Sequence, residues 1–161
     1  MIYLFIIILF VLSMINEDIK IVEDGVTAPK FSLYSDQNQL ISLSQFEGKK
    51  VILYFYPKNN TPACTQEAKD FRDNMKFFND NNIEIIGISK DGINSHRRFK
   101  EICDLPFHLL SDPECNVIKA YQAWVEKSMF GKKHMGIDRR TFLINEHGKI
   151  VKIWTKVKVQ N

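Results

Sequence analysis

Short apolar runs separated by polar turns divide most of the chain into alternating strands and helices. Continuous β-branched and aromatic runs at 51–56 and 83–88 are typical of buried strands. Apolar residues at helical spacing predict helices over 94–103 and 113–121, and another helix that begins just after Thr61. Weaker extended patterns predict further strands, of which the first two and the last two form hairpins: 31–34, 40–43, 107–110, 141–145 and 149–155.

Strands that alternate with helices and close on a hairpin predict an α/β fold with a central mixed sheet flanked by helices. The chain has 161 residues, of which 45% are hydrophobic. This length is enough for one domain with its own core, which we expect over residues 20–161. Internal repeats, low-complexity tracts, glycine-rich phosphate loops and interdomain linkers are not found in the sequence.

Cys64 stands at the start of a predicted helix. Pro57 and the asparagines after it end the strand over 51–56, and Thr61 and Pro62 match an N-cap followed by a first helical residue. Cys64 is then the third residue of the helix, where unpaired backbone N–H groups and the positive end of the helix dipole favour thiolate over thiol. The thiolate is the nucleophilic form, so Cys64 is a candidate reactive cysteine.

The position of Cys64 also fits an inert, packed side chain. Most free cysteines behave as small buried hydrophobes. Ala68, Phe71, Met75 and Phe78 form one apolar stripe with Cys64 at its N-terminal end. Position alone therefore permits catalysis at Cys64 but does not establish it.

Cys115 shows how little helix position decides by itself. Asp112 and Pro113 predict a cap and a first helical residue, which makes Cys115 a third residue as well. The dipole argument would activate this sulfur too. Cys115 lacks the upstream proline and threonine that precede Cys64, so we expect a structural role for it.

The residues around Cys64 carry a resemblance to a known family. Pro57, Thr61 and Cys64 have the Pro-x-x-x-Thr-x-x-Cys arrangement of the peroxiredoxins. The longer string over 55–68 is similar to the bacterioferritin comigratory protein, or peroxiredoxin Q, subfamily, although Ala63 replaces its usual glycine. The similarity extends over about 24–159 and is strongest at 87–91, 95–96, 109–113, 124–128 and 136–144. The resemblance implies a thioredoxin-like fold and a thiol peroxidase that reduces hydrogen peroxide or organic hydroperoxides.

The resemblance also assigns roles around the sulfur. Thr61 would offer its hydroxyl to the thiolate or to a bound peroxide, and Pro57 would shape the pocket and exclude water. A matched arginine, Arg139, would hold the thiolate and the peroxide, while Arg140 would point to solvent because neighbouring strand residues face opposite sides. Without the resemblance, Thr61 would be an ordinary N-cap, Pro57 a strand terminator and Arg139 a surface charge.

Recovery of the oxidised sulfur is the open part of the reaction. The reaction implies a sulfenic acid at Cys64, which a second thiol condenses with. Many relatives carry that thiol at the position of Lys69, and some carry it at the position of Lys100. Cys103 lies about one turn beyond Lys100 and is the candidate resolving cysteine, although a disulfide would require local unfolding. We expect instead a one-cysteine cycle in which thioredoxin or a similar dithiol is the reductant, with Cys103 in the core.

Composition excludes several other classes. Three cysteines without a Cys-x-x-Cys pair argue against a secreted disulfide framework and against a thioredoxin-like disulfide exchanger, which remains an alternative function. The scattered histidines suggest no zinc site, and we expect neither a metal nor a cofactor.

From Lys119 onward the sequence has 10 basic and 3 acidic residues, whereas the net charge of the whole chain is only +3. Because no nucleic-acid motif accompanies this charge, we expect a solvated face and no nucleic-acid partner.

The two ends of the sequence are unusual for the subfamily. Residues 1–15 are almost wholly apolar with no lysine or arginine before Lys20, and Met14 lies where relatives begin. We expect an over-extended start and a cytoplasmic protein, with a signal or anchor segment as the alternative.

The family continues into a terminal helix where this chain stops at Asn161. Without that helix an apolar sheet face would be exposed, which favours association and lowers solubility. We expect a monomer or weak homodimer, and a non-catalytic or chaperone-like remnant is another alternative function.

Overall fold

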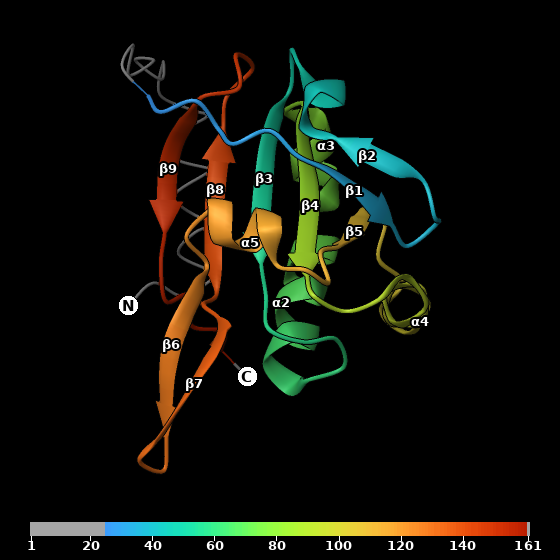
Figure 1. The fold of residues 1–161 in the computed structure, drawn as a ribbon. Helices are drawn as coiled ribbons and strands as arrows, with labels where there is room; N and C mark the ends of the chain where they lie inside the picture. The colour runs from blue at the N-terminus through green and yellow to red at the C-terminus, as the bar shows by residue number, and fades with distance from the viewer. Residues whose placement is uncertain (1–24, 161) are drawn as a thin grey trace.

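A mixed β-sheet forms the centre of the molecule (Figure 1). The computed structural model describes residues 25–160. In this part of the chain a seven-stranded sheet has the order β2-β1-β5-β4-β3-β8-β9, and β6 and β7 form a separate two-stranded sheet. β3, β4 and β5 are parallel neighbours, and the remaining neighbours in the large sheet are antiparallel.

The elements follow one another in an alternating order. Their bounds are β1 (Ser32–Ser35), β2 (Leu40–Ser42), the 3₁₀ helix η1 (Leu43–Phe46), β3 (Lys50–Phe55), α2 (Pro62–Asp73), α3 (Met75–Asp80), β4 (Ile83–Ser89), α4 (Ile93–Cys103), β5 (His108–Ser111), α5 (Asn116–Ala120), β6 (Trp124–Met129), β7 (Lys132–Ile137), β8 (Arg140–Ile144) and β9 (Ile150–Trp154). The α/β architecture expected from the sequence, a central mixed sheet flanked by helices, is confirmed.

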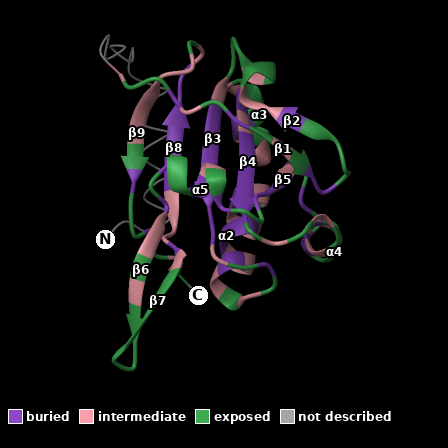
Figure 2. Cartoon of the chain, in the orientation of Figure 1, coloured by how far each residue is buried: buried purple, intermediate pink, exposed green. Residues whose placement is uncertain are grey.

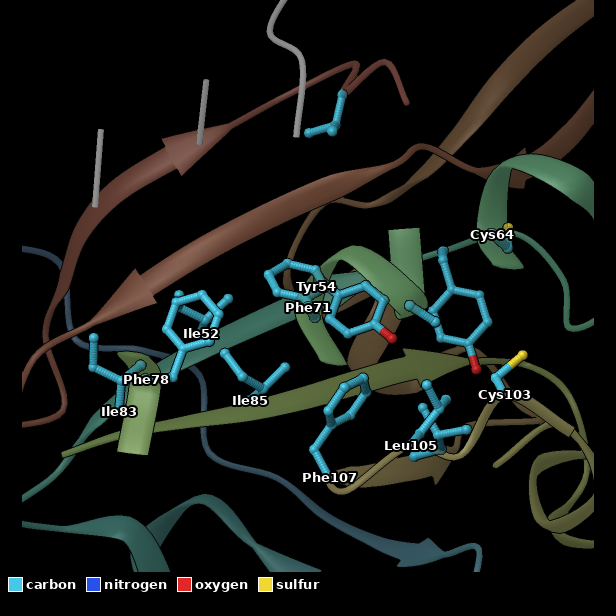
Figure 3. Close-up of a cluster of buried hydrophobic side chains, with 14 of the residues drawn as sticks. Ile52, Tyr54, Cys64, Phe71, Phe78, Ile83, Ile85, Cys103, Leu105 and Phe107 are labelled. Carbon is cyan, nitrogen blue, oxygen red and sulfur yellow. The ribbon is translucent and has the colours of Figure 1, made fainter. Parts of the chain in front are cut away.

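The central strand β3 carries side chains into two separate cores because successive residues face opposite sides of a sheet. Ile52 and Tyr54 join the cluster under α2, α3 and α4, which Figure 3 shows in close-up. Leu53 and Phe55 join the cluster on the face that α5 covers. Figure 2 shows β3 and its neighbours buried along most of their length. β3 is therefore packed against a core on each of its faces, and Cys64 lies in the helix that follows this strand.

The predicted strands are confirmed to within one or two residues, but other features differ. The apolar stripe behind Cys64 is not one helix, because α2 ends at Asp73 and α3 starts at Met75 after Asn74. The hairpin of β6 and β7 was not predicted at all. Its strands are mostly exposed or half-buried, so they lack the apolar alternation that reveals the others.

The chain after β9 passes close to the predicted site. Residues 155–160 form no helix, and the backbone N–H of Val157 donates to the carbonyl of Arg139 at 3.0 Å. Residues 1–15, expected to be an over-extended start, lie outside the described residues. In the part of the chain that is described, none of the helices has the length and apolar character needed to cross a membrane.

Candidate active site

The turn from β3 into α2 places Cys64 as predicted. Thr61 is the N-cap with an extended backbone (φ −86°, ψ 150°), Pro62 is the first helical residue, and Cys64 is the third. The N–H of Thr65 closes the first turn onto the carbonyl of Thr61 at 2.9 Å. First-turn N–H groups have no carbonyl partner within a helix, so this end of α2 presents positive charge near the sulfur.

Arg139 contacts the sulfur directly. Its Nη2 donates a hydrogen bond to Cys64 Sγ at 3.2 Å. The two residues are distant in sequence, but β8 pairs antiparallel with β3, and Arg140 stands opposite Phe55 at the end of the pairing. Arg139, just before β8, therefore lies beside the segment that leads to Cys64. The side chain of Cys64 is buried, with a relative exposure of 1%.

A carboxylate that sequence reasoning missed completes this arrangement. Glu67 Oε2 accepts a hydrogen bond from Arg139 Nη1 at 2.6 Å, and the Glu67 side chain is fully buried. Burial raises the pKa of Glu67 to about 7, although the charge of Arg139 and its hydrogen bond oppose the shift. The pKa of Arg139 is raised because Glu67 and Cys64 outweigh the cost of its own burial. Glu67 lies three residues after Cys64, on the same helix face, and that spacing is the signal that could have found it.

Thr61 and Pro57 lie in the turn before Cys64, as expected, but the Thr61 hydroxyl bonds a backbone carbonyl and not the sulfur. It donates to the carbonyl of Lys58 at 2.9 Å and makes no capping bond to the helix. The hydroxyl is therefore bonded within the turn that precedes Cys64. Pro57 is half-buried immediately after β3. Its ring has no N–H to donate at this point.

Arg140 does not simply face solvent as expected. Its Nε donates to Asp138 Oδ2 at 2.8 Å, and both side chains are largely buried. Of the two neighbouring arginines, only Arg139 bonds the sulfur. Asp138 neutralises Arg140 and leaves Arg139 as the cation beside Cys64.

A buried polar network, also missed by sequence reasoning, fixes the loop before Thr61. The Tyr56 hydroxyl donates to Asn59 Oδ1 at 2.7 Å and lies 3.2 Å from His96 Nδ1. The Asn59 N–H donates to Asp91 Oδ2 at 2.9 Å, and its side-chain amide donates to Ser95 Oγ at 3.0 Å. Burial lowers the pKa of His96. The network ties the end of β3 to β4 and α4, and so restrains the loop that positions Thr61 and Cys64.

Cys103 and Cys115 differ from Cys64 in their surroundings. Burial raises the pKa of both thiols, which makes them poorer nucleophiles. Cys103 ends α4, where its carbonyl accepts a hydrogen bond from Arg72 Nη1 at 2.7 Å. Figure 3 shows Cys103 and Cys64 apart in the same cluster, and all three cysteines are free.

The predicted helix position of Cys115 is wrong. α5 starts at Asn116, and Cys115 itself is the N-cap with a left-handed backbone (φ 57°). The carboxylate of Asp112 accepts the N–H groups of Asn116 and Ile118 at 3.1 and 2.8 Å. Two of the first-turn N–H groups of α5 therefore point to the carboxylate of Asp112.

Other candidate sites do not coincide with Cys64. Within residues 25–160 no group of three or more histidine, cysteine, aspartate or glutamate side chains is placed to bind a metal ion. A cavity of about 590 Å³ lies at the opposite end of β3, between Phe46, Val51 and Asn145, and contains none of the predicted site residues.

Comparison with known proteins agrees with the geometry. The sequence profile of the AhpC/TSA family matches residues 25–153. A putative peroxiredoxin bcp of Coxiella burnetii is 49% identical over 138 residues, which cover 86% of this chain and 91% of the relative. Peroxiredoxin Bcp of Bacillus subtilis is 46% identical over 140 residues, covering 87% of this chain and 89% of the relative.

Solved structures give the same result. A cysteine variant of PrxQ from Xylella fastidiosa superposes with a TM-score of 0.80 at 33% identity, covering 84% of this chain and 87% of that one. A bacterioferritin comigratory protein of Xanthomonas campestris, described for its alkyl peroxide reduction activity, gives a TM-score of 0.76 at 34% identity, with 80% and 82% of the chains covered. With the family profile, close relatives and fold in agreement, this chain belongs to the AhpC/TSA family, as a peroxiredoxin of the bacterioferritin comigratory protein subfamily.

Proposed function

We propose that this peroxiredoxin reduces hydrogen peroxide and organic hydroperoxides through a sulfenic acid on Cys64, and that thioredoxin or a similar dithiol recycles it. The observation that carries the proposal is the 3.2 Å hydrogen bond from Arg139 Nη2 to Cys64 Sγ. A guanidinium beside a sulfur at a helix start favours the thiolate, which is the nucleophile. The alkyl peroxide reduction described for the Xanthomonas campestris protein supports organic hydroperoxides as substrates.

The first step transfers one oxygen to sulfur. The Cys64 thiolate attacks the terminal oxygen of the peroxide, an S–O bond forms, and the O–O bond breaks. Sulfur is oxidised by two electrons to the sulfenic acid, and the departing oxygen takes up a proton as water or an alcohol. Negative charge moves from sulfur to the departing oxygen, so donors near both atoms lower the barrier.

Arg139 and Thr61 are the donors we assign to this step. Arg139 already bonds the sulfur, and its guanidinium has further N–H groups for a peroxide oxygen. The Thr61 hydroxyl is bonded to the carbonyl of Lys58 and would give up this bond to donate to a peroxide oxygen bound in the same turn. Pro57 excludes water from this turn in the proposed site.

The second step restores the thiol. A thiolate of the reductant attacks the sulfenic sulfur, forming a mixed disulfide and releasing water, and the second thiol of the reductant then frees Cys64. The raised pKa of Cys103 and its position at the end of α4 support a one-cysteine cycle over an internal disulfide. A Cys64–Cys103 bond is the competing route, and it requires local unfolding of α2 or α4.

Stopped-flow peroxide reduction separates an active peroxidase from a non-catalytic or chaperone-like remnant. We expect rapid reduction by the wild-type protein and none by Cys64→Ser, with Cys115→Ser as the matched control that keeps full activity. If wild type and Cys64→Ser are equally inert, the peroxidase proposal fails.

Mass spectrometry after one equivalent of peroxide tests the cycle. A dimedone adduct on Cys64, with no intramolecular disulfide, supports the one-cysteine route. A Cys64–Cys103 crosslink in the absence of the trap would refute it. Turnover with thioredoxin compared with glutathione then identifies the class of reductant, and disulfide exchange without peroxide would favour the thiol-disulfide exchanger.

A further inference from the structure

The turn between β6 and β7 exposes an aromatic side chain that the fold does not need. Met129 pairs with Lys132, so Phe130 and Gly131 are the two turn residues. The exposed fraction of Phe130 is 98%, the highest among the exposed large hydrophobic residues of the described chain. Figure 1 shows this hairpin projecting beyond the body of the molecule, and Figure 2 shows its tip exposed.

Phe130 is also a poor residue for the backbone conformation at this position. Both turn residues have positive φ, 51° at Phe130 and 76° at Gly131, as a type I′ turn requires. Asparagine or glycine fits the first position of such a turn, whereas a bulky residue at positive φ is strained. Neither turn formation nor core burial explains a phenylalanine here, and a residue that breaks local rules without a folding benefit indicates a function.

The surroundings of Phe130 are basic. Lys127, Met129 and Lys132 share one face of the hairpin, because Met129 pairs with Lys132 and Lys127 pairs with His134. Neither Lys127 nor Lys132 has an acidic partner among the described residues, whereas Lys133 on the other face is 3.5 Å from Glu126. The tip therefore combines apolar side chains with unpaired positive charge.

The hairpin is held rigidly at its base. Ile137 is buried, the N–H of Asp138 donates to the carbonyl of Ala123 at 2.7 Å, and Lys90 lies over the ring of Trp124 at 5.6 Å. At about 3.3 Å per strand residue, the tip lies roughly 20 Å from Ile137. A fixed base and a projecting tip suit contact with a surface outside the molecule.

We propose that the β6–β7 tip, formed by Met129, Phe130 and Lys132, inserts into the interface of an anionic phospholipid bilayer. Aromatic and apolar side chains enter the boundary between headgroups and acyl chains, and Lys132 beside them attracts anionic headgroups, while Lys127, whose side chain lies over Gly136 nearer the base, adds to the positive charge of this face. A stable protein partner needs an interface of about 1,200 Å² or more, which a narrow convex tip does not offer. A lipid surface needs no matching pocket, and this favours it over an acidic protein or a second copy.

Cosedimentation of the full-length protein with vesicles tests this proposal without any peroxide, so it is independent of the proposed reaction. We expect binding to vesicles of phosphatidylglycerol and phosphatidylcholine, and little binding to phosphatidylcholine alone. Phe130→Ser should weaken binding about tenfold. Lys132→Gln should weaken it about fivefold, and added salt should weaken the wild type.

Ile102→Ser and Lys76→Gln are the matched controls, since Ile102 on α4 is 71% exposed and Lys76 is an exposed lysine away from the hairpin. Both should bind as the wild type does. Binding that is unchanged in Phe130→Ser would assign the membrane contact to another segment and overturn the proposal. Equal binding to anionic and neutral vesicles, or none to either, would also overturn it.

Depth-dependent quenching gives a second measurement that does not rely on a loss of binding. Phe130→Trp adds an indole at the tip, and the wild-type signal from Trp124 and Trp154 is subtracted. Brominated phosphatidylglycerol should quench the added indole at position 130 and leave the one in Ile102→Trp unquenched. Equal quenching at the two positions would contradict insertion through the hairpin.

Discussion

Cys64 and Glu67 lie one helical turn apart on α2, and the guanidinium of Arg139 bonds both. Nη2 donates to Cys64 Sγ at 3.2 Å, and Nη1 donates to Glu67 Oε2 at 2.6 Å. Residues three apart share one face of a helix, so the rigid fork of an arginine can reach both at once. Glu67 therefore fixes the orientation of the guanidinium, and the guanidinium holds positive charge beside the sulfur.

Arg139→Lys should lower the rate of peroxide reduction by about a hundredfold or more, because a single ammonium cannot hold Glu67 and still serve sulfur and substrate. Stopped-flow measurement of the second-order rate constant checks this. Arg140→Lys is the matched control. Arg140 bonds Asp138 and not the sulfur, so its variant should keep most of the rate. Equal losses in the two variants would contradict the assignment of Arg139.

Glu67→Gln should change how stability depends on pH. Burial raises the pKa of Glu67 from 4.5 to about 7. Between these values the folded state binds a proton that the unfolded state has lost, so the contribution of Glu67 to stability falls as pH rises through this window and is constant above it. The full decline is roughly 3 kcal/mol, since each pKa unit corresponds to about 1.4 kcal/mol.

Urea unfolding at about pH 4 and about pH 8 measures this effect. The free energy of unfolding of the wild type, minus that of Glu67→Gln, should fall between the two pH values. Other titrating groups cancel in the difference because both proteins contain them. A difference that rises with pH would mean that Arg139 holds the carboxylate charged throughout and that its attraction dominates burial.

The parts of the fold that the sequence predicts are those with unambiguous burial. β3 and β4 have side chains buried on nearly every position, so their runs are continuous and their prediction is confirmed. The β6–β7 hairpin was missed because exposed strands carry no such pattern, and because Phe130 stands at the first turn position, where asparagine, aspartate or glycine is usual.

The site residues also divide into those that the sequence predicts and those that it does not. The capping pattern placed Cys64 correctly, but the same pattern failed at Cys115, where the Asp112 carboxylate caps the helix and the cysteine turns left-handed. Arg139 came from the family resemblance. The spacing of Glu67 from Cys64 places both on one helix face, but the sequence does not show that Glu67 pairs with an arginine 72 residues away.

Thr61→Val should lower the peroxide reduction rate by about a hundredfold, whereas Thr61→Ser should keep most of it, because only serine retains the hydroxyl donor. Stability should change by about 1 kcal/mol or less in both, since the hydroxyl makes one bond to the Lys58 carbonyl and does not cap α2. Stopped-flow rates and urea midpoints check the two parts. A rate loss of the same size in serine would point to packing of the Thr61 methyl group.

Gly87→Ala should destabilise the fold by about 1–3 kcal/mol, because the added methyl group would overpack a full core. An added Cβ would lie 2.8 Å from Tyr54 Cζ and 3.0 Å from Leu109 Cδ2. The Tyr54 ring cannot move freely, as it packs on Phe71 with ring centroids 4.7 Å apart. Gly92→Ala, where an added Cβ meets nothing within 4 Å, is the control and should cost less in the same urea titration.

Phe130→Asn should raise the free energy of unfolding by about 0.5–1 kcal/mol, an unusual gain for a change to an exposed residue. The backbone at this position has φ 51°, which asparagine tolerates far better than phenylalanine, and the lost ring buries almost no surface because it is 98% exposed. Urea unfolding of both proteins measures the difference. A variant that is more stable but binds anionic vesicles weakly would mean that Phe130 is kept for its contact with lipid at the expense of turn stability. A less stable variant would show that Phe130 supports the hairpin itself.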